Sequence, residues 1–264
     1  MSNIQKFEFS SLAALDSFCA EHPAAGRWVR ANDSRTGRNV NFYGTENFAA
    51  ASELLRAGCP DIVGALAAAS NRFGYAKSAG RPRPVLGVSG FAAHVPNYIT
   101  GVPENMINQT RPVVRQKVLR VYYNAAFNCR VDASEIIAVG GAMLAALRDL
   151  EKSGYRVELY CCTLTRFSYD KFTFMSARVK NASEPFNLGR LSYAVAHPSF
   201  LRRHSFAVRE TVAAVGFFDA GHGSSSSDPA VLAECTPAGA VVVSGMDYIK
   251  NPAGIETEIK RGLK

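Results

Sequence analysis

Three segments of the chain interleave arginine and lysine with aromatic residues. Cations neutralise phosphates and aromatic rings stack on unpaired bases, so this mixture is typical of proteins that bind single-stranded nucleic acid. The alternative for each segment is a solvated basic face with its aromatic rings turned into the core, and the recurrence favours binding for the set. The candidate DNA-binding residues are Arg27, Trp28, Arg30, Arg35 and Arg38 in the first segment, Arg72, Tyr75, Lys77, Arg81 and Arg83 in the second, and Arg166, Tyr169 and Lys171 in the third.

Motifs that would indicate an enzyme or a metal site are missing from the sequence. The chain has no G-x-S-x-G, no phosphate-binding G-x-x-x-x-G-K-[ST] loop and no G-x-G-x-x-G fingerprint. Its histidines and cysteines lack the spacings of zinc sites. A low-complexity GHGSSSS segment at 221–227 is interpreted as a flexible surface connection. We therefore expect no enzymatic activity, cofactor or metal, and a cryptic nuclease or phosphotransferase would need a carboxylate cluster that the spacing does not supply.

The net charge of +8 over 264 residues is unevenly distributed. Residues 61–115 carry six basic and two acidic residues, and residues 171–210 carry seven and two, whereas 211–264 carry four and six. A concentrated basic surface is the electrostatic feature expected for a polyanion partner such as nucleic acid. No apolar run is long enough to cross a bilayer and the N-terminal residues do not resemble a signal peptide, so no membrane partner and a cytoplasmic location are expected.

The segment 117–166 has the pattern of a strand, a helix and a second strand. An apolar run at 118–123 is followed by Asp132 and Ser134 as candidate N-caps, helical spacing to Leu150, and a strand resuming at Val157. Such a βαβ unit predicts an α/β fold with a mostly parallel, doubly wound sheet. Gly140 and Gly141 inside the helix predict its close packing on that sheet.

Further elements are expected on both sides of this unit. Helices are predicted at 10–19, 45–57 and 61–73, and short strands at 85–88, 167–174, 213–218 and 240–244. A helical region at 187–211 is interrupted by Pro198, and a last helix covers 252–263. We expect a helical, loop-rich N-terminal elaboration over 1–115 and the α/β core over 116–264. The adjacent Cys161 and Cys162 should point to opposite faces of a strand as buried free thiols.

The order of these elements resembles the von Willebrand factor A fold. In that fold an Asp-x-Ser-x-Ser loop after the first strand holds a divalent cation, and the matching positions here are Asn124, Ala126 and Asn128. Hard cations prefer charged oxygen ligands, which this loop lacks. The resemblance therefore implies the scaffold, a degenerate von Willebrand A-like unit, and argues against the metal.

A second resemblance covers most of residues 42–162. The segment GFAAHVPNYITGVPENMIN at 90–108, with Gly101, Pro103 and Met106 in a G-x-P-x-x-M element, precedes the βαβ unit, and Tyr43 and Gly44 precede an amphipathic helix. This arrangement is similar to the single-stranded-DNA-binding RNA polymerase cofactor family of schitoviruses. The resemblance implies a bacteriophage transcription cofactor, working in the cytoplasm of an infected bacterium, that binds single-stranded DNA and recruits a phage RNA polymerase. The alternative is a von Willebrand A-type protein-interaction adaptor without nucleic-acid binding, and homo-oligomerisation is left open.

Overall fold

The computed structural model describes residues 3–24, 34–71, 83–110, 117–211 and 222–263. In these residues a mixed sheet has the order β1-β7-β6-β5-β9, and the two-residue strand β8 pairs with β6. The strands are β1 Asn3–Phe9, β5 Val118–Asn124, β6 Arg156–Arg166, β7 Lys171–Lys180, β8 Ser224–Ser225 and β9 Val241–Ser244. β5 pairs in parallel with both β6 and β9, and β1 with β7, whereas β6 and β7 form an antiparallel hairpin. The chain is therefore an α/β protein with a mostly parallel central sheet, as the sequence predicts.

The predicted βαβ unit is confirmed. β5 leads into α7 (Ala133–Lys152), which returns the chain to β6 beside it. Asp132 caps the helix, and its backbone N–H donates to the Glu135 carboxylate at 3.0 Å, so the first turn satisfies an otherwise free donor. Gly154 closes the connection with φ of +94°, a conformation that favours glycine.

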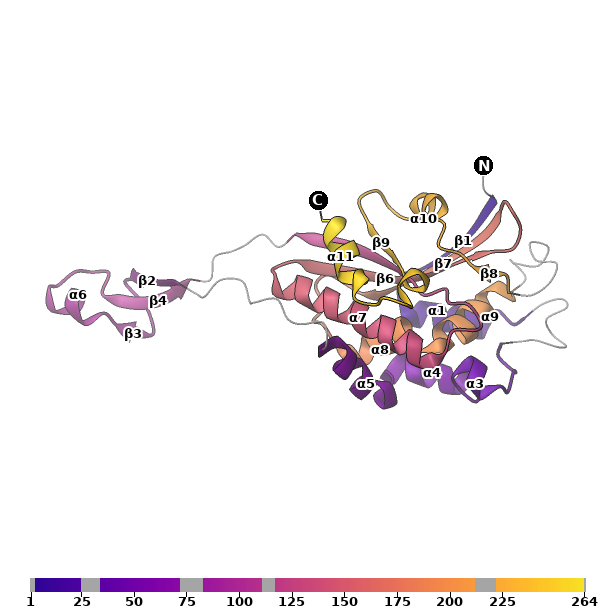
Figure 1. The fold of residues 1–264 in the computed structure, drawn as a ribbon. Coiled ribbons are helices and arrows are strands. Elements are labelled where there is room, and N and C mark those ends of the chain that lie inside the picture. Colours follow the sequence, from indigo (N-terminus) through magenta and orange to yellow (C-terminus); the bar gives the residue numbers. More distant parts are fainter. Residues whose placement is uncertain (1–2, 25–33, 72–82, 111–116, 212–221, 264) are drawn as a thin grey trace.

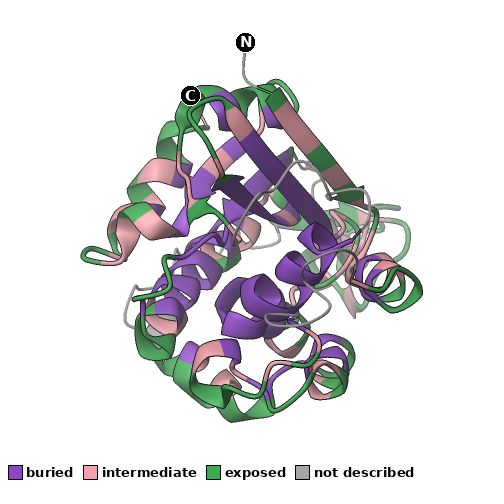
Figure 2. Ribbon diagram, turned by 90° about the vertical axis from the view of Figure 1, so that its right-hand side faces the viewer, coloured by how far each residue is buried: buried purple, intermediate pink, exposed green. Residues whose placement is uncertain are grey.

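Helices cover both faces of the sheet (Figure 1). One face carries α1 (Leu12–Glu21), α4 (Phe48–Ala57), α5 (Pro60–Asn71), α7, α8 (Leu188–Ala196), the π-helix η1 (Phe200–Ser205) and α9 (Phe206–Arg209), and α11 (Gly254–Arg261) packs beside α7. The other face carries α10 (Pro229–Cys235). The middle strands and the facing sides of the helices are buried (Figure 2). Cys161 belongs to the first core and Cys162 to the second, which confirms that these free thiols point to opposite faces.

The glycine in the middle of α7 packs against a helix rather than the sheet. A Cβ at Gly140 would lie 2.7 Å from the Ala196 Cβ and 2.9 Å from the Val195 carbonyl oxygen, both in α8. The prediction of close packing is confirmed at this position, but the expected neighbour was wrong. α7 contacts the sheet through β6 and also packs against α8, and Gly140 lies at the contact with α8.

The N-terminal residues contribute to the same sheet and core as the rest of the chain. β1 forms the edge strand beside β7, and Leu15, Leu55 and Leu66 of α1, α4 and α5 belong to the main core cluster. The ranges 1–115 and 116–264 therefore share one sheet and one hydrophobic core. The short helix α3 (Val40–Tyr43) and the turn η3 (Gly245–Tyr248) complete this body.

A small second sheet lies within residues 83–110. β2 (Arg83–Gly87) and β3 (Ala92–Ala93) both pair with β4 (Met106–Thr110), and α6 (Val95–Ile99) connects β3 to β4 (Figure 1). No residue from 84 to 108 is buried. The unit instead exposes a set of large apolar side chains: Val85, Leu86, Val88, Phe91, Val95, Tyr98, Ile99 and Val102.

The strand predicted at 167–174 is placed differently. Residues 167–170 form the turn of the hairpin, and β7 begins at Lys171 and continues to Lys180. The helical region at 187–211 is confirmed, and its break after α8 falls at His197, immediately before Pro198. The strand predicted at 213–218 lies outside the described residues.

Candidate functional site

Part of the third basic-aromatic segment forms the exposed tip of the β6–β7 hairpin. Tyr169 is 95% exposed, Arg166 is exposed, and Lys171 is partly exposed at the start of β7. The turn is held by a hydrogen bond from the Phe167 N–H to the Lys171 carbonyl at 2.9 Å. By contrast, Phe172 and Phe174 are buried in the core under α10. The structure thus brings Arg166, Tyr169 and Lys171 together and turns the neighbouring aromatic rings inward.

Most residues of the other two segments lie outside the described residues. These are Arg27, Trp28 and Arg30 in the first segment and Arg72, Tyr75, Lys77 and Arg81 in the second. Arg83 begins β2, but its side chain is not described either. Arg38 is described and exposed.

Arg35 has a structural role that conflicts with its selection as a DNA contact. Its side chain is only 14% exposed, and the guanidinium donates to the carbonyls of Cys19, His22 and Ala207. Nη1 also lies 3.7 Å from the Glu210 carboxylate. Since these contacts would have to break before a phosphate could bind, Arg35 is not part of the candidate DNA surface.

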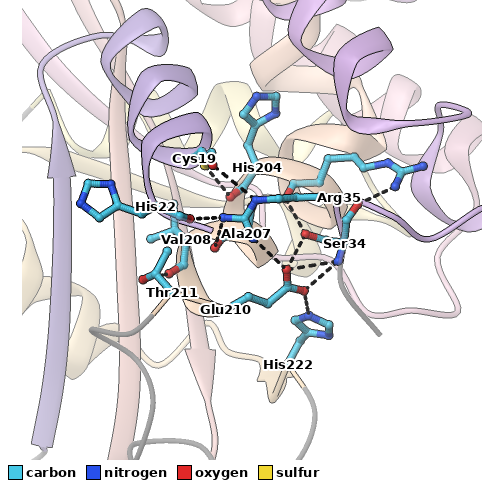
Figure 3. Close-up of polar contacts among 11 residues, drawn as sticks. Cys19, His22, Ser34, Arg35, His204, Ala207, Val208, Glu210, Thr211 and His222 are labelled. Atoms are coloured by element: carbon cyan, nitrogen blue, oxygen red, sulfur yellow. Dashed lines mark hydrogen bonds and ion pairs between the residues drawn. The ribbon is translucent and has the colours of Figure 1, made fainter. Parts of the chain in front are cut away.

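Glu210 is the centre of this buried polar cluster (Figure 3). Its carboxylate is fully buried and accepts hydrogen bonds from the Ser34 N–H at 3.0 Å, the Ser34 hydroxyl at 2.8 Å and His222 Nε2 at 2.7 Å. The cluster joins residues 34–35 to the end of α9 and to the segment that precedes β8. These contacts connect three parts of the chain that are far apart in sequence.

A second buried network links α1, α4, α8 and η1. His204 Nε2 donates to Asp16 Oδ1 at 3.2 Å, and the Tyr193 hydroxyl lies 2.6 Å from His204 Nδ1. Burial lowers the pKa of His204 more than Asp16 raises it, so the ring is neutral at pH 7. Burial alone would raise the pKa of Asp16, but hydrogen bonds from His204, Ser52 and Arg56 outweigh it and hold this pKa well below its usual range. Because the ring and the hydroxyl are fully enclosed, this Asp-His-Tyr chain links helices and does not present a catalytic base to solvent.

Four of the seven basic residues at 171–210 are buried, which corrects the expectation that this segment forms a basic surface. They are Lys180, Arg202, Arg203 and Arg209, with exposures of 2, 4, 0 and 2%. Lys180 pairs with Glu151 at 2.6 Å. The Arg202 guanidinium donates to the carbonyls of Phe42, Asn128 and Val131, and Arg203 donates to those of Ser34, Gly37 and Thr45. Both arginines lie in the π-helix η1 and reach carbonyls in different segments of the chain.

A cavity of about 120 Å³ lies at the carboxyl ends of β5 and β6. In open α/β sheets this edge is where ligands bind. Its polar lining includes Arg202, Arg209, His222, Ser224 and Ser225, together with the loop after β5, and none of its described lining residues is acidic. β8 pairs with the last residues of β6, so this cavity and the hairpin tip with Arg166 lie at the same end of that strand.

The loop that would hold a metal in the von Willebrand fold is stabilised by Asn124 instead. Its Oδ1 accepts from the Leu164 and Ala126 N–H groups, and its Nδ2 donates to the Ser226 carbonyl and the Ser244 hydroxyl. The side chain is fully buried and links β5, β6 and β9. Among the residues that the structure describes, no group of three or more His, Cys, Asp or Glu side chains could hold a metal ion.

Sequence reasoning missed the cationic cavity, because charged residues are normally assigned to the surface. The available signal was the helical region 187–211, which carries three arginines near its end, Arg202, Arg203 and Arg209, between apolar residues such as Phe200, Leu201, Phe206 and Val208. The GHGSSSS segment, interpreted as a surface connection, supplies His222, Ser224 and Ser225 to the lining.

Fold and site together define an α/β protein with a cationic cavity and an aromatic-basic hairpin at the carboxyl edge of its sheet. The family described as "Domain of unknown function (DUF7192)" matches residues 2–263, and the chain belongs to this family. No curated protein matches the chain significantly, and no solved structure does so. None of the helices in the described part of the chain is both long and apolar enough to span a bilayer.

Proposed function

We propose that this protein binds single-stranded DNA without catalysing a reaction, and that it serves as a transcription cofactor that brings a phage RNA polymerase to promoters. The observation that carries the DNA half is Tyr169, which is 95% exposed at the tip of a hairpin beside Arg166. An exposed ring in the turn between two paired strands can stack on a base, and the neighbouring cation can neutralise a phosphate. The resemblance to the schitovirus cofactor family supports the same function and implies the cytoplasm of an infected bacterium.

The polymerase half is supported by the small sheet at 83–110. Eight of the eleven exposed large hydrophobic residues among the described residues lie in this unit, and the other three are Val40, Val118 and Tyr169. The only acidic or basic residues in the range are Arg83 and Glu104, if histidine is counted as neutral. A surface this apolar and nearly uncharged suits a protein partner better than a polyanion.

The same unit favours a second candidate function, a protein-interaction adaptor of the von Willebrand A type that does not bind nucleic acid. The two functions differ in the role of the hairpin. In the adaptor, substitutions at the hairpin tip would leave partner binding unchanged and no DNA would bind.

Substitutions at the hairpin tip test the DNA half. Tyr169→Ala should weaken binding of a labelled single-stranded oligonucleotide by roughly 1–3 kcal/mol, because one stacked base is lost. Its salt dependence should stay unchanged, since stacking releases no counterions. Arg166→Ala should instead lower the slope of log affinity against log salt by roughly 0.7 for one lost phosphate contact.

The matched control is Tyr98→Ala, which removes an aromatic ring that is 68% exposed on the small sheet. It should leave DNA affinity at the wild-type value. If folded Tyr169→Ala and Arg166→Ala variants both bind as the wild type does, the hairpin is not the DNA site.

A further inference from the structure

The guanidinium of Arg209 is buried with weak compensation for its charge. Nη2 donates to the hydroxyls of Thr163 and Ser205 at 3.0 and 2.9 Å, and Nη1 donates to the His222 carbonyl at 3.3 Å. Its Nε has no hydrogen-bond acceptor among the described residues, and no described carboxylate forms an ion pair with it. Burial lowers the pKa of Arg209 to about 9 although the charge of the neighbouring Glu210 carboxylate opposes this shift, and the group stays charged at neutral pH. A buried cation without a carboxylate is costly unless something else compensates it.

Arg202 also lines this cavity without a carboxylate of the described residues in ion-pair contact. Its described acceptors are three backbone carbonyls, and it forms no ion pair with a carboxylate of the described residues. Its guanidinium lies 4.6 Å from the centre of the Phe42 ring, which stabilises the cation without neutralising it. The buried carboxylate of Glu210, which follows Arg209 in the chain and opposes the fall of its pKa, already interacts with Ser34, Arg35 and His222.

Arg202 and Arg209 line one cavity, and neither has a carboxylate of the described residues in ion-pair contact, so both can supply positive charge to an anion. We propose that the cavity formed by Arg202, Arg209, His222, Ser224 and Ser225 binds a phosphate group. The arginine and serine donors come from η1, α9 and β8, whereas His222 lines the cavity with its Nε2 bonded to Glu210. A tetrahedral phosphate accepts hydrogen bonds from several directions, whereas a carboxylate accepts them in one plane.

The volume of the cavity is also consistent with a bound phosphate group. Its volume of about 120 Å³ is several times the roughly 30 Å³ share of a water molecule in the liquid. It is well below the roughly 300–1,000 Å³ of sites that enclose drug-sized molecules. The cavity therefore accommodates the phosphate and not a whole nucleotide, so the ligand is a free phosphate ion or the terminal phosphate of a longer molecule.

Gly223 positions the serines beside this cavity. Its φ is +74°, and a Cβ there would lie 2.6 Å from Thr165 Cγ2 and 2.8 Å from the Arg166 carbonyl oxygen. Only glycine lets the chain approach the end of β6 this closely and then pair as β8. The backbone is thus shaped to bring Ser224 and Ser225 to the arginines.

Inorganic phosphate is the probe that tests the site, and the assay needs no DNA. Thermal unfolding of the full chain is followed while sodium phosphate replaces sodium chloride at constant ionic strength. The melting temperature should rise with phosphate concentration as expected for binding to a saturable site on the folded protein. The absence of any rise beyond that in chloride would overturn the proposal, whatever the outcome of the DNA experiments.

Substitutions of Arg209 and Arg202 test whether these arginines bind phosphate or only stabilise the fold. Arg209→Met removes the buried charge while keeping similar volume, and Thr163 and Ser205 still hydrogen-bond each other at 2.7 Å. This variant should fold with little loss of stability in chloride but bind phosphate at least about tenfold more weakly, because charge-assisted hydrogen bonds are lost. Arg202→Met should weaken phosphate binding similarly and serves if Arg209→Met does not fold. The control Arg261→Gln removes one exposed cation and should keep wild-type phosphate affinity.

If folded Arg209→Met and Arg202→Met keep the wild-type phosphate response, the cavity is not the site. Once phosphate binding is established, matched oligonucleotides with and without a 5′-phosphate identify its source. Tighter binding of the phosphorylated strand, lost in Arg209→Met, assigns the site to a strand end. Equal binding of the two strands assigns it to the free ion.

Discussion

Replacing Glu210 with glutamine should destabilise the protein more than any comparable change at the surface. Glu210 is fully buried, and its carboxylate accepts from the Ser34 N–H, the Ser34 hydroxyl and His222. It is also the described counter-charge of Arg35, at 3.7 Å. The amide would remove this charge and place an N–H₂ group against groups that now donate to the carboxylate.

The size of the effect follows from these contacts. Removing one partner of a buried ion pair costs roughly 3–5 kcal/mol. The lower limit applies here, because Arg35 keeps its three carbonyl acceptors and its side chain is 14% exposed. At roughly 2–4 °C per kcal/mol for a chain of this size, a loss of about 3 kcal/mol should lower the melting temperature by about 6–12 °C.

The control is Glu256→Gln, which breaks an exposed pair with Lys260 four residues further along α11. Such pairs contribute only about 0.3–0.5 kcal/mol, so this melting temperature should fall by no more than about 2 °C. Both variants are compared with the wild type by circular dichroism at one pH and ionic strength. If Glu210→Gln melts within about 2 °C of the wild type, the buried cluster does not stabilise the fold as described.

Three further predictions concern packing, protonation and metals. Gly140→Ala should lower the free energy of unfolding in urea by roughly 1–3 kcal/mol, because the new Cβ would contact α8. Gly64→Ala, which has nothing within 4 Å of its Cβ, should raise this free energy by roughly 0.5–1 kcal/mol through helix propensity. Equal effects of the two substitutions would refute the packing argument. Burial lowers the pKa of His197 to about 4, so the contribution of this residue to stability is complete above the unfolded pKa of about 6.5 and is lost as the pH falls toward 4. His197→Gln should therefore reduce the pH dependence of the unfolding free energy between about pH 6.5 and 4. An unchanged pH dependence in this variant would contradict the prediction. Chelator should change neither the melting temperature nor DNA affinity, because Asn124 makes its hydrogen bonds within the fold, and a saturable shift with magnesium would show otherwise.

The parts of the fold that follow local pattern could be predicted from the sequence. The βαβ unit has clear strand and helix periodicity with caps at both ends of α7, and Pro198 interrupts the helical region where expected. Cys161 and Cys162 fall on opposite faces because alternation in a strand depends only on geometry.

Features that depend on tertiary contacts could not be predicted. β1 has a mixed polar and apolar pattern and is recognised as a strand only when its partner β7 is known. The buried arginines were assigned to the surface because their carbonyl acceptors come from distant segments, such as Phe42 and Val131 for Arg202. For the same reason the cavity was missed, whereas the exposed hairpin tip could be proposed from local composition.

The most direct test of the central claim is a comparison of single-stranded and duplex DNA of the same sequence at matched salt. Fluorescence anisotropy gives both affinities over a salt series. We predict tighter binding of the single strand, with log affinity falling by roughly 0.7 per unit of log salt for each phosphate contacted. Equal affinities, or no binding of the single strand at low salt, would contradict the proposed function.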